Sequence, residues 1–285
     1  MKIAIATLTA SAFLLTGCGS GGNNGSSSNT QQTTTRAGTP ITEKQNPEGI
    51  WLGTTKNRKR AFALVGPVQA SGHQPFHFAI DVGTHRYMPS IAGFLTSQIR
   101  TFSANDVKSP FSATRLALEG NITSGQFLTA RLVVPGSSND TPVEEYAFDY
   151  NPDYDRPLPV KALMGNYSDL ARTLPGYGGY DHQSPLALTV DGHGILSGHV
   201  NGCAVTGTLF DLGKNQKRLF SLTLEATPYD SSTTCFSGKR GETRAVGLTG
   251  LATLTRFKGD NVDSLLFAAT DATGERLLAG AVAKQ

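Results

Sequence analysis

The chain has 285 residues, of which 38% are hydrophobic and 16% are charged. Its 25 Lys and Arg against 22 Asp and Glu give a formal net charge of only +3. A nearly balanced charge lacks the basic excess typical of nucleic-acid binding, so we expect no nucleic acid among its partners.

The first residues have the pattern of an export signal. Lys2 is the only charge ahead of an apolar run over 3–15, which is too short to cross a bilayer. The run ends at Leu15-Thr16-Gly17-Cys18, which resembles the lipobox of bacterial lipoproteins. In that family the cysteine sulfur receives a diacylglyceryl group, the signal is cut before it, and the new N-terminus is acylated. The resemblance implies a signal peptide at 1–17 and lipidation at Cys18; a plain secretory signal is the alternative.

Residues 18–40 are predicted to be the lipidated cysteine and a flexible tether, because their Gly, Ser, Asn, Thr and Gln composition cannot bury enough apolar surface to fold. A coil of this length reaches roughly 25 Å. Gly19 and Ser20 lack the aspartate that this family associates with retention at the inner membrane. The resemblance therefore implies a lipid anchor in the outer membrane, with the body on its periplasmic or surface face.

The body that follows has short hydrophobic segments and many of the chain's 32 glycines. This composition favours short strands joined by tight turns over helical bundles. We predict an all-β fold, an antiparallel meander that forms a barrel or a sandwich. It would be either one lipocalin-like barrel or two small β lobes.

The N-terminal β region, residues 41–150, opens with a hairpin. We expect Trp51, the only tryptophan, to fill one end of a core; stacking on a ligand is the alternative. The basic tip, residues 56–60, is typical of a turn that discourages edge pairing, and contact with anionic lipid headgroups is its alternative. We expect strands over 50–55, 60–65, 76–82, 86–91, 94–102, 114–119, 126–134 and 144–150.

Residues 151–162 are predicted to be a Pro-rich linker between two β regions. Asp149, Asp153 and Asp155 lie in or beside it, but their spacing lacks the glycine and the terminal glutamate of an EF-hand loop. We therefore expect a solvated acidic linker rather than a calcium site.

The C-terminal β region, residues 163–285, alternates strands with turns. Asp191-Gly192 and Asn201-Gly202 supply the positive φ that two-residue hairpin turns need. A longer strand is expected over 244–256 and a closing hairpin over 264–282.

This region also resembles a broad group of β-rich proteobacterial lipoproteins. The resemblance is carried by Gly-x-Tyr near residue 165, "LTVDGHGILSGHVNGCAVTGTL", "GLTGLATL" and "ATDATGERLLAG". It implies the compartment, a β fold and a disulfide, and it implies no chemistry.

Three cysteines are present in the chain. With Cys18 assigned to the lipid, Cys203 and Cys235 remain as an even pair in an exported, oxidising compartment, which predicts a disulfide. A catalytic or metal-binding thiol is the alternative, but neither cysteine has a Cys-x-x-Cys partner or a histidine at ligand spacing.

The sequence contains no Gly-x-Ser-x-Gly elbow, His-Glu-x-x-His or Walker-type loop, so we predict no catalytic residue. The segment 72–85 holds His73, His77, Asp81 and His85, ligand types that suit zinc. Pro75 and Gly83 interrupt its strand geometry, so we expect solvent-facing side chains, no metal and no cofactor. His193 and His199 flank a hairpin, where we expect them to be exposed.

These patterns predict a membrane-anchored envelope protein that acts as a binding or envelope-maintenance module without catalysis. Its partners would be the membrane, through the N-terminal lipid, and either a small hydrophobic ligand inside a barrel or another envelope protein. A hydrolase of envelope polymers and an inhibitor or adaptor are the alternatives.

Overall fold

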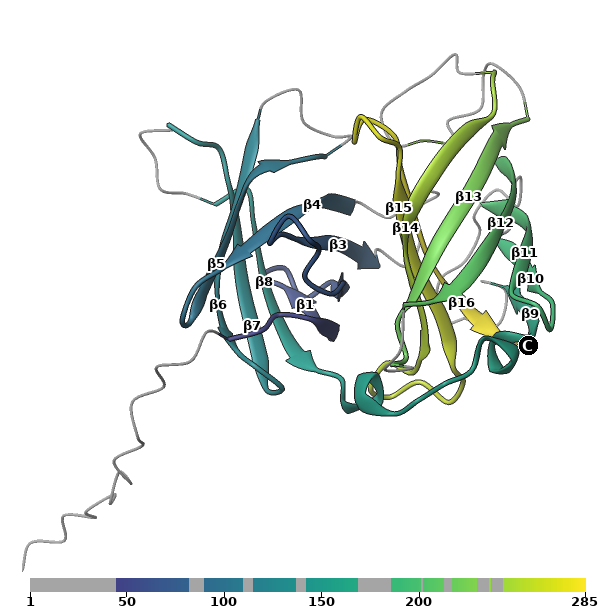
Figure 1. The fold of residues 1–285 in the computed structure, drawn as a ribbon, viewed down its shortest axis with the longest axis horizontal. Helices are drawn as coiled ribbons and strands as arrows, with labels where there is room; N and C mark the ends of the chain where they lie inside the picture. Colours follow the sequence, from purple (N-terminus) through teal and green to yellow (C-terminus); the bar gives the residue numbers. More distant parts are fainter. Residues whose placement is uncertain are drawn as a thin grey trace, which may run out of the picture. The chain divides into compact units, whose positions relative to one another are not determined.

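Strands dominate the computed structural model of this chain, and they close into two antiparallel barrels (Figure 1). The residues that the structure describes are 45–81, 90–109, 115–136, 142–168, 186–200, 202–212, 217–229, 236 and 243–285. Both barrels belong to the unit Ile41–Gln285. Within the described residues, no helical segment has the length and apolar character needed to span a membrane.

The N-terminal barrel is an up-and-down meander in chain order, coloured purple to teal in Figure 1. β8 pairs with β1, so the sheet closes on itself and has no unpaired edge. Its strands are β1 Gly49–Thr55, β2 Arg60–Val65, β3 Gln74–Asp81, β4 Ser90–Ser97, β5 Thr101–Val107, β6 Leu116–Thr123, β7 Phe127–Val133 and β8 Glu144–Tyr150.

The C-terminal barrel, green to yellow in Figure 1, is closed by its shortest strands. β9 lies between β10 and β16 and completes the ring. Its strands are β9 Gly165–Ser168, β10 Ala187–Val190, β11 Ile195–Val200, β12 Cys203–Asp211, β13 Phe220–Pro228, β14 Val246–Thr255, β15 Ser264–Thr270 and β16 Leu277–Lys284.

The all-β prediction is confirmed as two β lobes, and the sandwich alternative is wrong because both sheets close. The predicted break between 86–91 and 94–102 is also wrong, since β4 runs through it and turns after Ser97. The strand continues through Gly93. A Cβ at this position would lie 3.0 Å from the Phe76 ring, so the glycine makes room for that ring on the neighbouring strand.

The turn after β10 differs from the expected two-residue hairpin. Asp191 accepts hydrogen bonds from the backbone N–H groups of His193 and Ile195, both at 2.8 Å, and so holds a longer turn. The glycine with positive φ is Gly194 (82°) rather than Gly192. Side-chain bonding by Asp191 therefore replaces the primed turn that the dipeptide predicts.

Each barrel is filled by its own inward-facing side chains. In the N-terminal barrel the Phe78 ring packs edge-on against Tyr146 and Phe148, with centroids 5.5 and 5.3 Å away. Trp51 is fully buried in this core, where its indole N–H donates to the Pro47 carbonyl at 2.8 Å, so its predicted core role is confirmed. The C-terminal core is built from Leu, Val and Phe side chains and includes Phe236.

A third buried cluster joins the two barrels, and we call it the inter-barrel seam. It forms because the outward faces of β1–β3 and of β14–β16 are apolar, which is unusual for strands that alternate between core and solvent. Its members are Ile50, Phe62, Leu64, Ala79, Tyr154, Leu219, Leu251, Phe257, Leu266, Ala268, Ala279 and Ala281.

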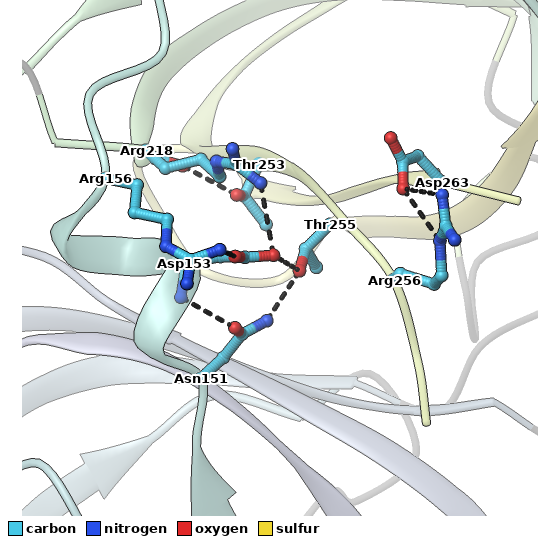
Figure 2. A network of polar contacts seen from close by, with 8 residues as sticks. All are labelled: Asn151, Asp153, Arg156, Arg218, Thr253, Thr255, Arg256 and Asp263. Carbon is cyan, nitrogen blue, oxygen red and sulfur yellow. Dashed lines mark hydrogen bonds and ion pairs between the residues drawn. The ribbon is translucent and has the colours of Figure 1, made fainter. Parts of the chain in front are cut away.

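Polar contacts from the connecting segment border the seam (Figure 2). The short 3-10 turns η1 Pro152–Asp155 and η2 Val160–Leu163 form part of this segment. The Asn151 side-chain amide donates a hydrogen bond to the Thr255 hydroxyl at 2.5 Å, and the Asp153 carboxylate forms an ion pair with Arg218 at 3.1 Å. Asp149 and Asp155 are exposed, as expected for a solvated acidic linker. The prediction is wrong at Asp153, which bridges the connecting segment to the C-terminal barrel, and at Tyr154, whose side chain lies in the seam.

We predict that Asp153→Ala destabilises the protein by about 1–3 kcal/mol, because it leaves the partly buried Arg218 guanidinium without its carboxylate. The matched control is Asp263→Ala, which removes an ion pair between Asp263 (43% exposed) and Arg256 (51% exposed). Because both partners are exposed, this variant should change the stability by under about 1 kcal/mol. Thermal unfolding of both variants measures the difference; equal shifts would contradict this role for Asp153.

Candidate functional site

Two shallow depressions on the outer walls of the barrels are the candidate sites. The first, which we call the C-terminal wall, has a volume of about 500 Å³ and lies on β9–β11. Leu188 and Leu196 point inward to the core, so that Thr189, Ser197 and His199 point outward by strand alternation. Its outward-facing polar side chains are Asn166, Ser168, Thr189, Ser197, His199 and Gln285.

The floor of the C-terminal wall depends on a glycine. A Cβ at Gly198 would lie 2.1 Å from the Ala187 carbonyl oxygen, so the two strands approach more closely than any other residue allows. The φ of 147° at Gly198 also disfavours a side chain. The absence of a side chain at Gly198 therefore allows the close approach of β10 and β11 below the wall.

Hydrogen-bonding groups and one aromatic pair surround this floor. The Thr189 hydroxyl donates to the Asn166 side-chain oxygen at 3.1 Å. His199 contacts the ring of Tyr229 with centroids 5.5 Å apart, and Tyr229 is 51% exposed. Among the described residues that line the wall there is no Asp, Glu, Lys or Arg. These residues offer hydroxyl, amide and imidazole groups to a partner, without a carboxylate, ammonium or guanidinium side chain to attract ions.

The second depression, the N-terminal wall, has about 340 Å³ and lies on β5–β7. It also centres on a strand glycine, since a Cβ at Gly120 would lie 2.1 Å from the Thr129 carbonyl oxygen. Unlike the C-terminal wall it carries charge, because Glu119 and Arg131 face each other across β6 and β7 at 3.6 Å. The two walls thus share a shape and differ in electrostatics.

The histidines have different environments. His73 and His193 are exposed, and a ring nitrogen of His73 lies 3.2 Å from the Thr96 hydroxyl. The expectation of a solvent-facing His77 is wrong: the residue is 4% exposed, because the outer face of β3 is covered in the seam. Burial lowers the pKa of His77 to about 4.

The histidines and aspartates considered as metal or calcium ligands lie partly outside the described residues. His85 lies outside the described residues, as does the side chain of Asp81. Among the described residues, no three His, Cys, Asp or Glu side chains lie close enough to hold a metal ion. Asp155 pairs instead with Lys217 at 3.0 Å.

The basic tip of the first hairpin is partly neutralised. Lys56 pairs with Glu145 at 2.9 Å, and Arg60 reaches Asp260 at 3.0 Å while stacking over Phe257. Arg60 therefore belongs to the contact between the barrels, which leaves less positive charge for lipid headgroups than the sequence indicates.

Sequence reasoning missed most of the C-terminal wall. His199 is expected from the sequence only as an exposed hairpin residue, and Asn166 and Tyr229 carry no signal. Nothing in the sequence shows that β9 pairs with β10 beside β11, or that the residue after β13 contacts His199. Comparison with models of protein families, with curated proteins and with solved structures gives no match.

Cys203 is fully buried and is not a free thiol, whereas Cys18 and Cys235 lie outside the described residues. The pairing of Cys203 with Cys235 stays a prediction. Such a bond would close a 33-residue loop and contribute roughly 3–4 kcal/mol on the chain-entropy model.

We predict that Cys203→Ala, Cys235→Ala and the double variant lower the melting temperature by similar amounts, because each loses the same bond. Mass spectrometry of the unfolded, non-reduced protein after thiol labelling gives the direct measurement. Labelling of both cysteines would rule out the pair.

Proposed function

We propose that this chain is a lipid-anchored protein of the outer membrane whose two barrels form a non-catalytic binding module. The C-terminal wall is its contact surface, and the partner is an uncharged, hydroxyl-rich chain such as an envelope saccharide. The observation that carries this proposal is the C-terminal wall itself, where hydroxyl and amide groups converge beside an exposed aromatic pair and the described lining residues include no Asp, Glu, Lys or Arg.

The barrel interiors favour binding on the outside. Large side chains such as Trp51, Phe76 and Phe78 fill the N-terminal barrel, and Phe220 and Phe267 lie in the other. Such packing leaves little room for the small hydrophobic ligand that a lipocalin-like interior could hold. An outer wall is then the better candidate surface.

The chemistry of the wall suits saccharides. Sugar hydroxyls donate and accept hydrogen bonds, and the Asn166 and Gln285 amides can do both. Tyr229 presents an apolar ring and a polar hydroxyl, a combination that packs against the C–H faces of a sugar while remaining in water. These properties support a neutral polar partner over a phosphate or a nucleic acid.

A second candidate, an adaptor for another envelope protein, is favoured by exposed apolar side chains. Ile195 on β11 is 48% exposed, and Phe210 on the neighbouring strand β12 is 50% exposed. Leu212, just after β12, is 36% exposed. Apolar side chains gathered on one surface are typical of protein contacts. This cluster lies on the same barrel as the C-terminal wall, but the two can be altered separately.

We predict that Cys18→Ser removes fatty-acid labelling and releases the body from the membrane fraction, because stable anchoring needs more than one acyl chain. Metabolic labelling and fractionation of the host provide the measurement. Continued labelling of the variant would refute the anchor, and an unlabelled variant that stays membrane-bound would show a second attachment.

We predict that the full-length lipoprotein in detergent co-sediments with insoluble envelope polysaccharide. Replacing His199 and Tyr229 by Ala should lower its apparent affinity by roughly fivefold or more, since an aromatic contact contributes about 1 kcal/mol.

The matched control for this experiment is the double variant Thr101→Ala, Asn121→Ala on the N-terminal wall, which should bind like the parent. Binding lost only after Ile195 and Phe210 are changed would contradict the C-terminal wall as the saccharide contact and place that contact on the apolar surface instead. No co-sedimentation, or binding that neither wall affects, would overturn the saccharide assignment.

A further inference from the structure

His77 lies in the inter-barrel seam with an unpartnered ring nitrogen. Its neighbours Phe76 and Phe78 point into the N-terminal core, so His77 shares the opposite face of β3 with Ala79, the face that packs against β15 and β16. Within the described part of the chain its Nδ1 atom is buried and makes no hydrogen bond. The hydroxyl of Ser90, which lies opposite Ala79 on β4, is buried and unpartnered as well.

The surroundings of His77 are apolar on both sides of the seam. On its own sheet it lies between Leu64 and Ala92. Across the seam β15 and β16 contribute Leu266, Ala268, Ala279 and Ala281. The titratable groups of these strands stand at their ends: Arg60 on β2, Asp81 on β3 and Lys284 on β16.

Charged groups of the adjoining segments are already paired with one another. Lys108, which follows β5, pairs with Asp106 at 3.1 Å. Asp271 and Arg276, in the turn between β15 and β16, pair at 3.0 Å. No carboxylate of the described residues is thus placed to compensate a proton on His77, and a charge buried without a partner is strongly unfavourable.

We propose that the seam is an acid-labile joint, in which proton uptake by His77 opens the contact between the two barrels while each barrel keeps its own core. The separate cores make this division possible, because the residues that fill each barrel are not those that form the seam. This inference is independent of the proposed binding function.

The direction of the effect follows from linkage. Burial holds the pKa of His77 at about 4 in the closed seam, against 6.5 for an exposed imidazole. The closed state therefore keeps its full stability above pH 6.5 and loses it as the pH falls toward 4. The open-to-closed ratio should rise about 20-fold between pH 7 and pH 5, and about 300-fold in total at lower pH.

Cysteine labelling can measure this ratio even when the open state is rare. Three variants of the full-length protein in detergent, each with one cysteine added to the native three, are required: Ser90→Cys in the seam, Ala130→Cys inside the N-terminal core and Thr101→Cys on the exposed wall. The parent protein gives the background labelling of the native cysteines. A pyridyl disulfide that reacts at mildly acidic pH labels each one, and the rate at the exposed site corrects for the pH dependence of the reagent. The labelling rate of a buried site reports its opening equilibrium.

We expect the corrected rate at Ser90→Cys to rise about 20-fold from pH 7 to pH 5, while that at Ala130→Cys changes less than about twofold. Adding His77→Leu should abolish the rise in the labelling rate. If the leucine variant folds poorly, His77→Gln, which is polar but not titratable, replaces it and should also abolish the rise. His73→Leu, which changes an exposed histidine just before β3, should leave the rise unchanged. Ala279→Cys gives a second seam probe from the other barrel.

Three outcomes would overturn the joint. They are a seam rate that does not respond to pH, a rise that persists in both His77 variants, and a parallel rise at Ala130→Cys, which would mean that acid unfolds the N-terminal barrel instead. The fluorescence of Trp51, buried in that barrel, checks the last case in the same samples.

Discussion

The inter-barrel seam is the constraint on which the rest of the structure depends. Barrel strands usually alternate between a core face and a solvent face, yet Ile50 and Leu64 in one barrel and Leu251 and Leu266 in the other are apolar on the outside and buried. Separating the barrels would expose all of these side chains to water, at roughly 25 cal/mol for each Å². The barrels thus stabilise each other, although each closes its own sheet.

The seam also decides which walls remain available for binding. It covers the outer faces of β1–β3 and β14–β16, with β4 packed against β16 at its border. In a ring of eight strands the side opposite β1–β3 is β5–β7, and the side opposite β14–β16 is β10–β12. The N-terminal wall lies on the first of these sides, whereas the C-terminal wall lies on β9–β11 and begins at the strand beside β16. Both walls therefore lie on strands outside the seam, and their different charge follows from the residues that each strand presents.

The strands were predictable where one face meets solvent, because period-two alternation is a strong signal, as in Phe220–Pro228. The seam was not predicted, although the sequence holds a signal for it. β15 and β16 are apolar at nearly every position, and this pattern is typical of strands that are buried on both faces. In β3 the apolar run is interrupted by His77, a residue type that usually faces solvent, so the sequence does not show that this strand is buried on both faces. β9 was missed because four residues are too few for a pattern, and so the closure of the second barrel and the C-terminal wall could not be foreseen.

A histidine in this position is informative because an apolar residue would serve packing better. The unpartnered Nδ1 atom costs about 1–3 kcal/mol in a seam whose hydrophobic cluster consists of aliphatic and aromatic side chains. The polar contacts beside the seam do not need it, since Asn151, Asp153 and Arg60 find their partners elsewhere. The seam therefore combines apolar packing, ion pairs at its border and one buried imidazole, and the lowered pKa of that imidazole couples opening of the seam to proton uptake as the pH falls from 7 to 5. This combination makes the arrangement of the barrels, rather than the fold of either one, the property that acid would alter first.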